Sequence, residues 1–439
     1  MFMWNQKEIE ASLSGKINIE QIDDTGATIL CWAARYGKLP IVKFLLENHK
    51  NIMNKPDHEG RSPLHWAIQQ DDIEITIALL GEGADVNCNN YAGLKPLHLA
   101  VYYDNAQIVR ELIAHGAEVN QPDKEGKSPL HWAIYYARTE VVLTLIAHGA
   151  EVNQPDEQGR IPLHCITRRE IDAVSIMALI TNGADVDHLD NENRSPLYYA
   201  AYYGQTEILK ILIGVKANVN MIDERKSTPL HAAVSGGKIE NVKALIYENA
   251  KIDAPNEKMA TPLHLAASSG RIEIIKALIE AKANIEAVDA CGDTPLFNAV
   301  FFGHTNVVKF MVSQGANIHH INNHKQTLLD IACSWPQPDM HRLLIDCFRI
   351  SALWEAWELE TYYFDYYLQW LPREMLEDVI SQFEYSLDSK KNIPVTSKSS
   401  SLIRYAPFPA PFFSYLLSEK ACPEENNIDT AMFKKRKTR

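Results

Sequence analysis

Apolar residues recur along most of the chain in short stripes that fit one face of a helix. Two such stripes are Ile108, Val109, Leu112 and Ile113, and Ile274, Ile275, Leu278 and Ile279. Residues three and four apart share a helix face, so each stripe predicts a short amphipathic helix. A Gly-Ala pair follows several stripes, and a left-handed glycine commonly ends a helix. These pairs begin at Gly83, Gly116, Gly149, Gly183 and Gly315.

A tetrapeptide of the type Ser/Thr-Pro-Leu-His predicts another helix before each stripe. Serine or threonine caps a helix N-terminus, and proline is tolerated in the first turn. The ten copies are spaced by 33 residues in seven intervals and by 34 in two. They begin at Thr28, Ser62, Lys95, Ser128, Ile161, Ser195, Thr228, Thr261, Thr294 and Thr327. Each unit is a turn and two helices, and such units must stack to bury their apolar faces.

This unit resembles the repeat of the ankyrin family, whose T-P-L-H-x-A signature recurs every 33 residues. The resemblance covers residues 21–350 as ten repeats. It implies an all-α solenoid of helix-turn-helix repeats with β-hairpin-like loops and a concave surface that binds partners. Lys216, Asn249 and Lys282 replace the closing glycine, and we expect looser helix ends there.

The period is absent at both ends of the chain. Residues 1–20 predict an N-terminal capping helix. After the repeats, residues 351–383 predict an aromatic and acidic helical region, and residues 384–404 form a Ser/Lys-rich linker. Residues 405–439 hold a Pro/aromatic segment and a basic tail.

Composition narrows the classes of function. No apolar run in the 439 residues approaches the ~18 residues of a membrane span, and the N-terminus does not fit a secretory signal. Seven scattered cysteines are typical of a reducing compartment. A formal charge of −13 disfavours binding to nucleic acid. We therefore expect an intracellular, cytoplasmic monomer.

The residue pattern predicts no catalytic, metal or cofactor site, and hence no enzyme. Six histidines recur at one position of the repeat, as structural turn residues would: His65, His98, His131, His164, His231 and His264. The cluster of His319, His320 and His324 has no further ligands to complete a zinc set. Phosphate-binding loops and nucleophile elbows are absent from the sequence.

A candidate partner-binding site, with stronger support than the histidines, lies on the first helix of each repeat and just before its tetrapeptide. The resemblance implies that these positions face the concave groove. Aromatic and cationic residues recur there, and Tyr and Arg are frequent interface hot spots. The predicted partner-binding residues are Arg61, Tyr102, Tyr103, Lys127, Tyr135, Tyr136, Arg160, Arg168, Arg169, Arg194, Tyr202, Tyr203, Phe301 and Phe302.

The sequence favours a non-catalytic scaffold or adaptor that binds a protein or peptide with acidic and apolar side chains. An alternative stays open, in which the rings only pack on one another across neighbouring repeats. A second alternative is a substrate adaptor of a cullin-type ubiquitin ligase, since residues 371–383 resemble the start of an F-box. Certain viral and bacterial ankyrin proteins carry such a segment after their repeats.

The basic run Lys434–Lys437 resembles a nuclear-import signal. The tail around Glu419, Glu424 and Glu425 resembles the export signals of bacterial effectors delivered into host cells. A plain solvated terminus remains the alternative to both.

Overall fold

The computed structural model describes residues 19–166, 171–333, 339–340 and 342–348. The chain divides into two compact units, Met1–Glu257 and Lys258–Arg439, which we call unit 1 and unit 2. The described residues of both units are helical and contain no strand, apart from one isolated bridge between Ile22 and Thr28. The prediction of an all-α repeat solenoid is therefore confirmed.

Each repeat of unit 1 contributes a first and a second helix. The first helices are α2 (Ile29–Arg35), α4 (Pro63–Gln69), α6 (Pro96–Tyr102), α8 (Pro129–Tyr135), α11 (Pro196–Tyr203) and α13 (Pro229–Gly236). The second helices are α3 (Leu39–Asn48), α5 (Ile73–Gly81), α7 (Ala106–Ala114), α9 (Thr139–Ala147), α10 (Ala173–Thr181), α12 (Thr206–Gly214) and α14 (Ile239–Tyr247). Two 3₁₀ turns are also present, η2 (Lys50–Ile52) and η3 (Pro162–His164).

Unit 2 repeats the same pattern. Its first helices are α15 (Pro262–Ser268), α17 (Pro295–Phe301) and α19 (Leu328–Cys333), and its second helices are α16 (Ile272–Glu280) and α18 (Thr305–Ser313). Helix α17 contacts both α15 and α19, and α16 contacts α18. Residues 339–340 and 342–348 are helical as well.

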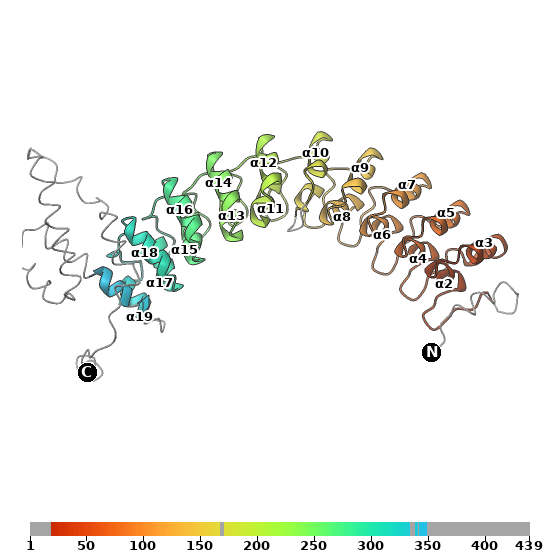
Figure 1. Cartoon of the computed structure of the whole chain (residues 1–439), viewed down its shortest axis with the longest axis horizontal. Coiled ribbons are helices and arrows are strands. Elements are labelled where there is room, and N and C mark those ends of the chain that lie inside the picture. Colours follow the sequence, from red (N-terminus) through yellow and green to blue (C-terminus); the bar gives the residue numbers. More distant parts are fainter. Residues whose placement is uncertain (1–18, 167–170, 334–338, 341, 349–439) are drawn as a thin grey trace, which may run out of the picture. The chain divides into compact units, whose positions relative to one another are not determined.

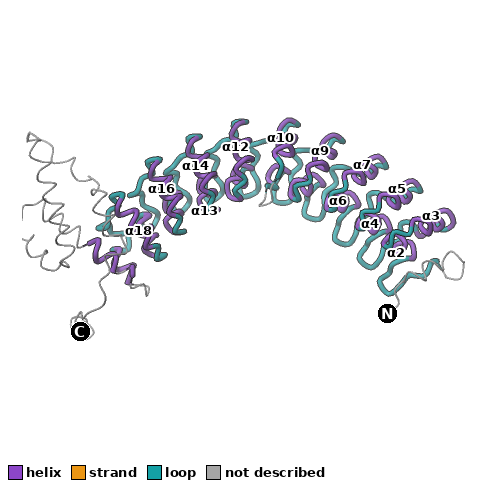
Figure 2. The backbone as a smooth tube through the Cα atoms, in the orientation of Figure 1, coloured by secondary structure: helices purple, strands orange, loops and turns teal. Residues whose placement is uncertain are grey.

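The helices of unit 1 form two rows (Figure 1). First helices follow one another along one row and second helices along the other, and each helix contacts its neighbours in its own row. Figure 2 shows the loops that join consecutive repeats. The apolar stripes of the second helices point into the space between the rows, where residues such as Ile108, Val109 and Leu112 are fully buried. This burial of both rows against each other is the main source of stability in such an array.

The recurring histidines connect each repeat to the next. Nδ1 of His65 accepts a hydrogen bond of 3.2 Å from the backbone N–H of Ser62, as the predicted turn requires. Its Nε2 lies 3.2 Å from the carbonyl oxygen of Leu94, one repeat further on. A ring that accepts at Nδ1 and donates at Nε2 is neutral. The same two contacts recur at His98, His131, His164 and His264.

The three residues that replace the closing glycine keep its backbone conformation. Lys216, Asn249 and Lys282 have φ values of +67°, +60° and +71°. Side chains with a Cβ are disfavoured in this left-handed region by roughly 1–2 kcal/mol for each residue. The repeat geometry therefore imposes a conformation that these residues do not favour themselves.

The fifth repeat differs from the other repeats of unit 1 in its first helix. The sequence predicts a helix like α8, but the described residues of this segment, up to residue 166, form only the three-residue turn η3, and Cys165 and Ile166 follow it outside any helix. Ile166 stands where the nine other copies have alanine, as at Ala133 and Ala200, which are fully buried. A regular helix would force the larger Ile166 side chain into that close approach, so the turn is not continued.

Several predicted segments lie outside the described residues. They are most of the N-terminal cap (1–20), the aromatic region with its F-box-like segment (351–383), the linker (384–404) and the Pro/aromatic segment with the basic tail (405–439). Their predicted roles stay predictions. Among the helices that the structure does describe, none is long and apolar enough to cross a membrane.

Candidate functional site

Exposed tyrosines lie at the ends of three first helices of unit 1, α6, α8 and α11. Tyr102 and Tyr135 are the last residues of α6 and α8, and Tyr202 is the penultimate residue of α11. They are 42%, 47% and 39% exposed, which is high for aromatic side chains at three equivalent positions. We call the surface formed by these helix ends and by the turns before the first helices the inner face of unit 1.

The second tyrosine of each pair packs against neighbouring rings. Tyr136 is half-buried and lies edge-on to Tyr102 of the preceding repeat, with ring centroids 5.2 Å apart. Tyr203 is half-buried and stacks on Tyr199, at 6.4 Å. Tyr103 differs because it is exposed, edge-on to Tyr102 at 5.1 Å. Ring packing is therefore real, but at least one tyrosine of each pair stays exposed.

The predicted cationic residues of the inner face are held by carboxylates of their own turns. Each arginine pairs with the buried aspartate four residues before it: Arg61 with Asp57 (2.8 Å), Arg160 with Asp156 (2.7 Å) and Arg194 with Asp190 (3.1 Å). Lys127 pairs with Glu125. Burial alone would lower the pKa of Lys127, but the contact with Glu125 outweighs it and raises that pKa.

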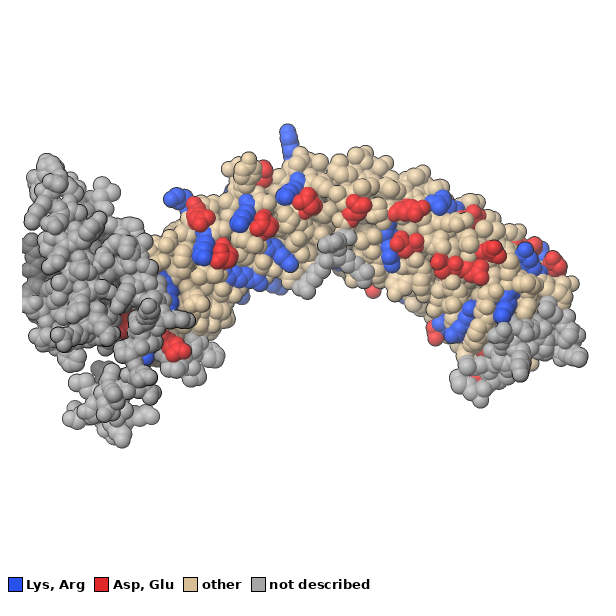
Figure 3. Space-filling model, viewed as in Figure 1, with Lys and Arg blue, Asp and Glu red and all other residues tan. Residues whose placement is uncertain are grey.

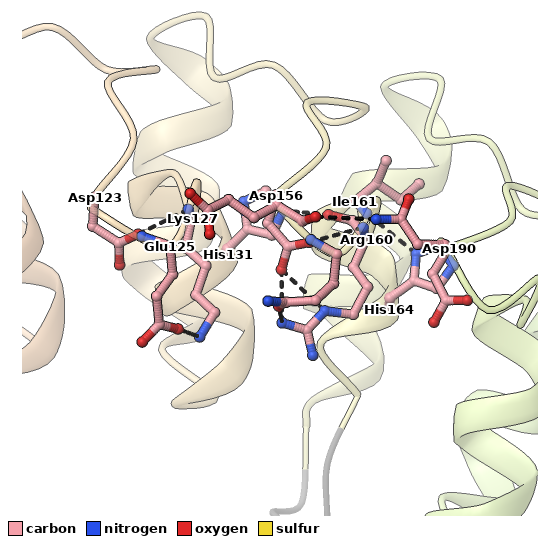
Figure 4. Close-up of polar contacts among 12 residues, drawn as sticks. Asp123, Glu125, Lys127, His131, Asp156, Arg160, Ile161, His164 and Asp190 are labelled. Atoms are coloured by element: carbon pink, nitrogen blue, oxygen red, sulfur yellow. Dashed lines mark hydrogen bonds and ion pairs between the residues drawn. The ribbon is translucent and has the colours of Figure 1, made fainter.

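These pairs leave little net charge on the inner face. Figure 4 shows the Lys127–Glu125 and Arg160–Asp156 pairs on consecutive turns. Figure 3 shows a flank of unit 1, where lysines and arginines are likewise interspersed with aspartates and glutamates. The charges of Arg61, Lys127, Arg160 and Arg194 are thus largely compensated, and the exposed rings become the dominant feature of the described part of the inner face.

A pocket of about 350 Å³ opens on the inner face beside the interrupted fifth repeat. Residues of α8 and of the turn before it line one side, and Tyr199 and Tyr203 of α11 line the other. Arg160, His164, Cys165 and Ile166 line it between these helices. The remaining lining residues are Asp123, Glu125, Lys127, His131, Trp132, Tyr135 and Tyr136.

The pocket exists because the fifth repeat lacks a ring as well as a helix. In neighbouring repeats an aromatic residue nine positions after the turn aspartate bonds to it. Trp66 Nε1 donates to Asp57 at 3.2 Å, Trp132 Nε1 to Asp123 at 2.8 Å, and Tyr199 Oη to Asp190 at 2.7 Å. Cys165 is the matching residue for Asp156. This small side chain leaves unfilled space between Trp132 and Tyr199.

Sequence reasoning missed this pocket, although two signals were present. One was Cys165, which stands where the two flanking repeats have Trp132 and Tyr199, and the other was Ile166 in an alanine position. The predicted set also includes two residue pairs that are not part of this description of the site. Arg168 and Arg169 lie outside the described residues, while Phe301 and Phe302 are exposed residues at the end of α17 in unit 2.

The titratable groups of the pocket are held in unreactive states. Burial lowers the pKa of His164 to about 4 and also lowers that of His131, so both rings are neutral at pH 7. Burial raises the pKa of the Cys165 thiol to about 12, which keeps it protonated and poorly nucleophilic. Burial, followed by the hydrogen bond to Asp190, raises the pKa of Tyr199. The site therefore offers shape and hydrogen bonds to a ligand.

Three side chains of unit 2 lie close enough together to be considered as ligands of a metal ion. Asp289, Cys291 and Asp293 have ligand atoms within 4.8 Å of one another. However, Asp289 Oδ1 accepts hydrogen bonds from the backbone N–H groups of Cys291 and Asp293, as turn aspartates do in other repeats. The grouping follows from the turn itself.

Comparison with known proteins agrees with the geometry. The family model for ankyrin repeats matches residues 5–90, 74–156, 152–223, 215–289 and 281–352. A 68-residue segment, 16% of this chain, is 34% identical to palmitoyltransferase ZDHHC13 of Homo sapiens and of Pongo abelii. The Mus musculus protein of that name is 35% identical over 68 residues.

The chain matches only 11% of the length of each of these three relatives, which is too little to transfer their activity. The ankyrin matches, in contrast, run from residue 5 to residue 352 of the 439 residues. They coincide with the stacked helix pairs of both units, and ankyrin repeats are protein–protein interaction modules. The chain belongs to the ankyrin-repeat family.

Proposed function

We propose that this protein is a non-catalytic adaptor or scaffold whose inner face in unit 1 binds a segment of a partner protein. The observation that carries the proposal is the series Tyr102, Tyr135 and Tyr202, which project from three equivalent helix ends. Tyrosine supplies a large contact area and a hydroxyl with little loss of conformational entropy on binding.

Stability does not account for the exposed rings. The buried stripes of the second helices already hold the rows together, and each projecting ring exposes apolar area to water. Several exposed aromatic side chains on one surface are typical of an interaction site. The half-buried Tyr136 and Tyr203 support their exposed neighbours from the side, since the ring centroids are 5.0 Å and 5.2 Å apart.

The ion pairs of the inner face indicate which side chains of the partner should provide the affinity. Because Arg61, Arg160 and Arg194 are each paired with a buried aspartate, their attraction for acidic groups of a partner is reduced. Apolar and aromatic side chains should therefore provide most of the affinity. Acidic side chains of the partner would contribute mainly by hydrogen bonding to tyrosine hydroxyls.

A photo-crosslinking experiment tests the proposal. A photoreactive phenylalanine analogue is placed at Tyr135 in the full chain, and crosslinked proteins are identified by mass spectrometry. The same analogue at Tyr247 of α14, which is 83% exposed, is the matched control on a second helix. Partners should crosslink from position 135 and not from position 247.

The triple variant Tyr102→Ala, Tyr135→Ala and Tyr202→Ala completes the test in a quantitative pull-down of the crosslinked partner. Binding should fall at least about tenfold, while the thermal unfolding curve changes little, because these rings are exposed. Tyr247→Ala should bind normally. Full binding by the triple variant would show that the inner face is not the interaction surface.

A further inference from the structure

We infer that the pocket beside η3 is the anchor site of the inner face and takes one uncharged aromatic side chain of the partner. The inference rests on the proposed function and deepens it, because it names the chemistry of the group that binds. Three features carry it: the aromatic walls, the internal neutralisation of charge and the size of the space.

Rings from two separate helices face the pocket. On the α8 side, Trp132 and Tyr136 form a tilted pair with centroids 5.7 Å apart. On the α11 side, Tyr199 and Tyr203 are stacked at 6.4 Å. A ring inserted between these pairs would meet aromatic faces and edges on both sides, which is the arrangement that aromatic rings prefer.

The charges of the lining are already matched to one another. Lys127 pairs with Glu125, and Arg160 donates from both Nε and Nη2 to Asp156, a neighbour just behind the lining. Asp123 accepts hydrogen bonds from Trp132 Nε1 and from the backbone N–H groups of Glu125 and Lys127.

This pairing disfavours a charged occupant of either sign. A cationic side chain would meet Lys127 and Arg160, and an anionic side chain would meet Asp123 and Glu125. In each case the occupant would compete with an existing ion pair or hydrogen bond, and the lining group would lose part of its partner. An uncharged ring requires no such rearrangement.

The size of the space agrees with a single side chain. The volume of about 350 Å³ lies at the lower end of the range for small-ligand pockets. The chain itself shows how a ring occupies the equivalent place, because Trp66 and Trp132 fill it in repeats two and four. The partner's ring would take the place that a tryptophan at position 165 would fill.

The substitution Cys165→Trp therefore blocks the pocket with a residue that the repeat already accepts. Its indole N–H would also supply Asp156 with the hydrogen bond that Asp57 and Asp123 receive from Trp66 and Trp132. Tyr203→Ala is a second variant that removes one wall without filling the space. Tyr247→Ala is the control, because Tyr247 is exposed at the end of α14 and does not line the pocket.

Binding of the N-acetyl amides of tryptophan, tyrosine, arginine and glutamate to the full chain is measured by saturation-transfer NMR. The tryptophan and tyrosine amides should bind saturably in the millimolar range, and the two charged amides at least about tenfold more weakly. Cys165→Trp should abolish binding of the tryptophan amide, and Tyr203→Ala should weaken it at least about threefold. Tyr247→Ala should leave it unchanged.

Three results would overturn the inference. The first is the absence of saturable binding by the tryptophan amide, and the second is tighter binding of a charged amide. The third is binding of the tryptophan amide to Cys165→Trp or Tyr203→Ala that is as strong as its binding to the unsubstituted chain. Crosslinking from position 135 is measured separately. If crosslinking persists when the amides fail, only the anchor site is wrong. If crosslinking fails, the proposed function is wrong, whatever the amides do.

Discussion

Nε and Nη2 of Arg160 donate hydrogen bonds of 3.0 and 2.7 Å to Oδ2 of the buried Asp156. The same oxygen of the equivalent Asp190 is shared between Arg194 and the hydroxyl of Tyr199. Arg160 thus takes over the contact that an aromatic ring makes in neighbouring repeats. The arginine beside the pocket is a structural partner of its turn as well as a lining residue.

Arg160→Ala should lower the free energy of unfolding by about 2–3 kcal/mol, because it leaves the buried Asp156 carboxylate without its side-chain donor. Arg194→Ala should cost less, about 1 kcal/mol, since Asp190 keeps the Tyr199 hydroxyl. Urea unfolding followed by circular dichroism compares the two variants. Equal losses would mean that the ring contact contributes nothing.

Gly236→Ala should destabilise unit 1. A Cβ built on Gly236 would lie 2.1 Å from the carbonyl oxygen of Tyr202, so α11 and α13 must move apart. Such overpacking costs about 1–3 kcal/mol. Gly81→Ala is the control, because no atom lies within 4 Å of its Cβ position, and it should stabilise by up to about 1 kcal/mol. Thermal melts should move in opposite directions, and a shared direction would contradict the packing argument.

Lys282→Gly should stabilise unit 2 by about 1 kcal/mol. Lys282 holds a φ of +71°, and glycine adopts this conformation without the Cβ penalty. Lys276→Gly in helix α16 of the same repeat should instead destabilise by about 1 kcal/mol, because glycine weakens a helix interior. The free energies of unfolding in urea decide between these signs. A loss of stability in Lys282→Gly would show that contacts of the lysine side chain stabilise the fold by more than its left-handed backbone conformation costs.

The stability of the array should decrease between pH 6.5 and pH 4. Burial lowers the pKa of His65, His98 and His164 to about 4, below the ordinary value of 6.5. In this window the unfolded chain binds protons that the folded chain cannot, so acid favours unfolding. Each of these histidines should cost about 1–2 kcal/mol between pH 7 and pH 5. Full stability is retained above pH 6.5.

Urea midpoints at pH 7, 6 and 5 measure this dependence. His98→Asn should reduce the slope against pH, whatever its effect at pH 7, because one titrating group is removed. His115→Asn, at the exposed end of α7, controls for the exchange of histidine for asparagine itself. A slope unaffected by His98→Asn would remove the buried histidines as its cause.

The sequence alone was sufficient for the repeat, its boundaries within the array and its turn chemistry. The proline after Ser62 and the recurring histidines are local signals. The N-cap Ser62 and the ring of His65, which bond to each other, are only three residues apart. The aromatic pairs at the ends of the first helices were also predictable. Helix periodicity places Tyr102, Tyr135 and Tyr202 at equivalent positions in their repeats.

The sequence analysis did not predict that the arginines of the inner face are paired with aspartates, although both residue types are visible in the sequence. Arg160 and Asp156 lie four residues apart, but the pair forms only because the turn brings their side chains together while burying the aspartate. Counting residue types at exposed positions treats each arginine as a free cation. The turn geometry decides how much of that charge a partner can use.

The helix-turn-helix repeat is therefore determined by the sequence, because it depends on contacts within a few residues and on a regular spacing. The pocket comes from the tertiary structure, because its walls belong to α8 and α11, whose residues are separated by a whole repeat. Cys165 and Ile166 read as minor departures from the repeat when taken singly. Only stacking shows that they leave open space between two pairs of aromatic rings, since a cavity is defined by what its neighbours do not fill.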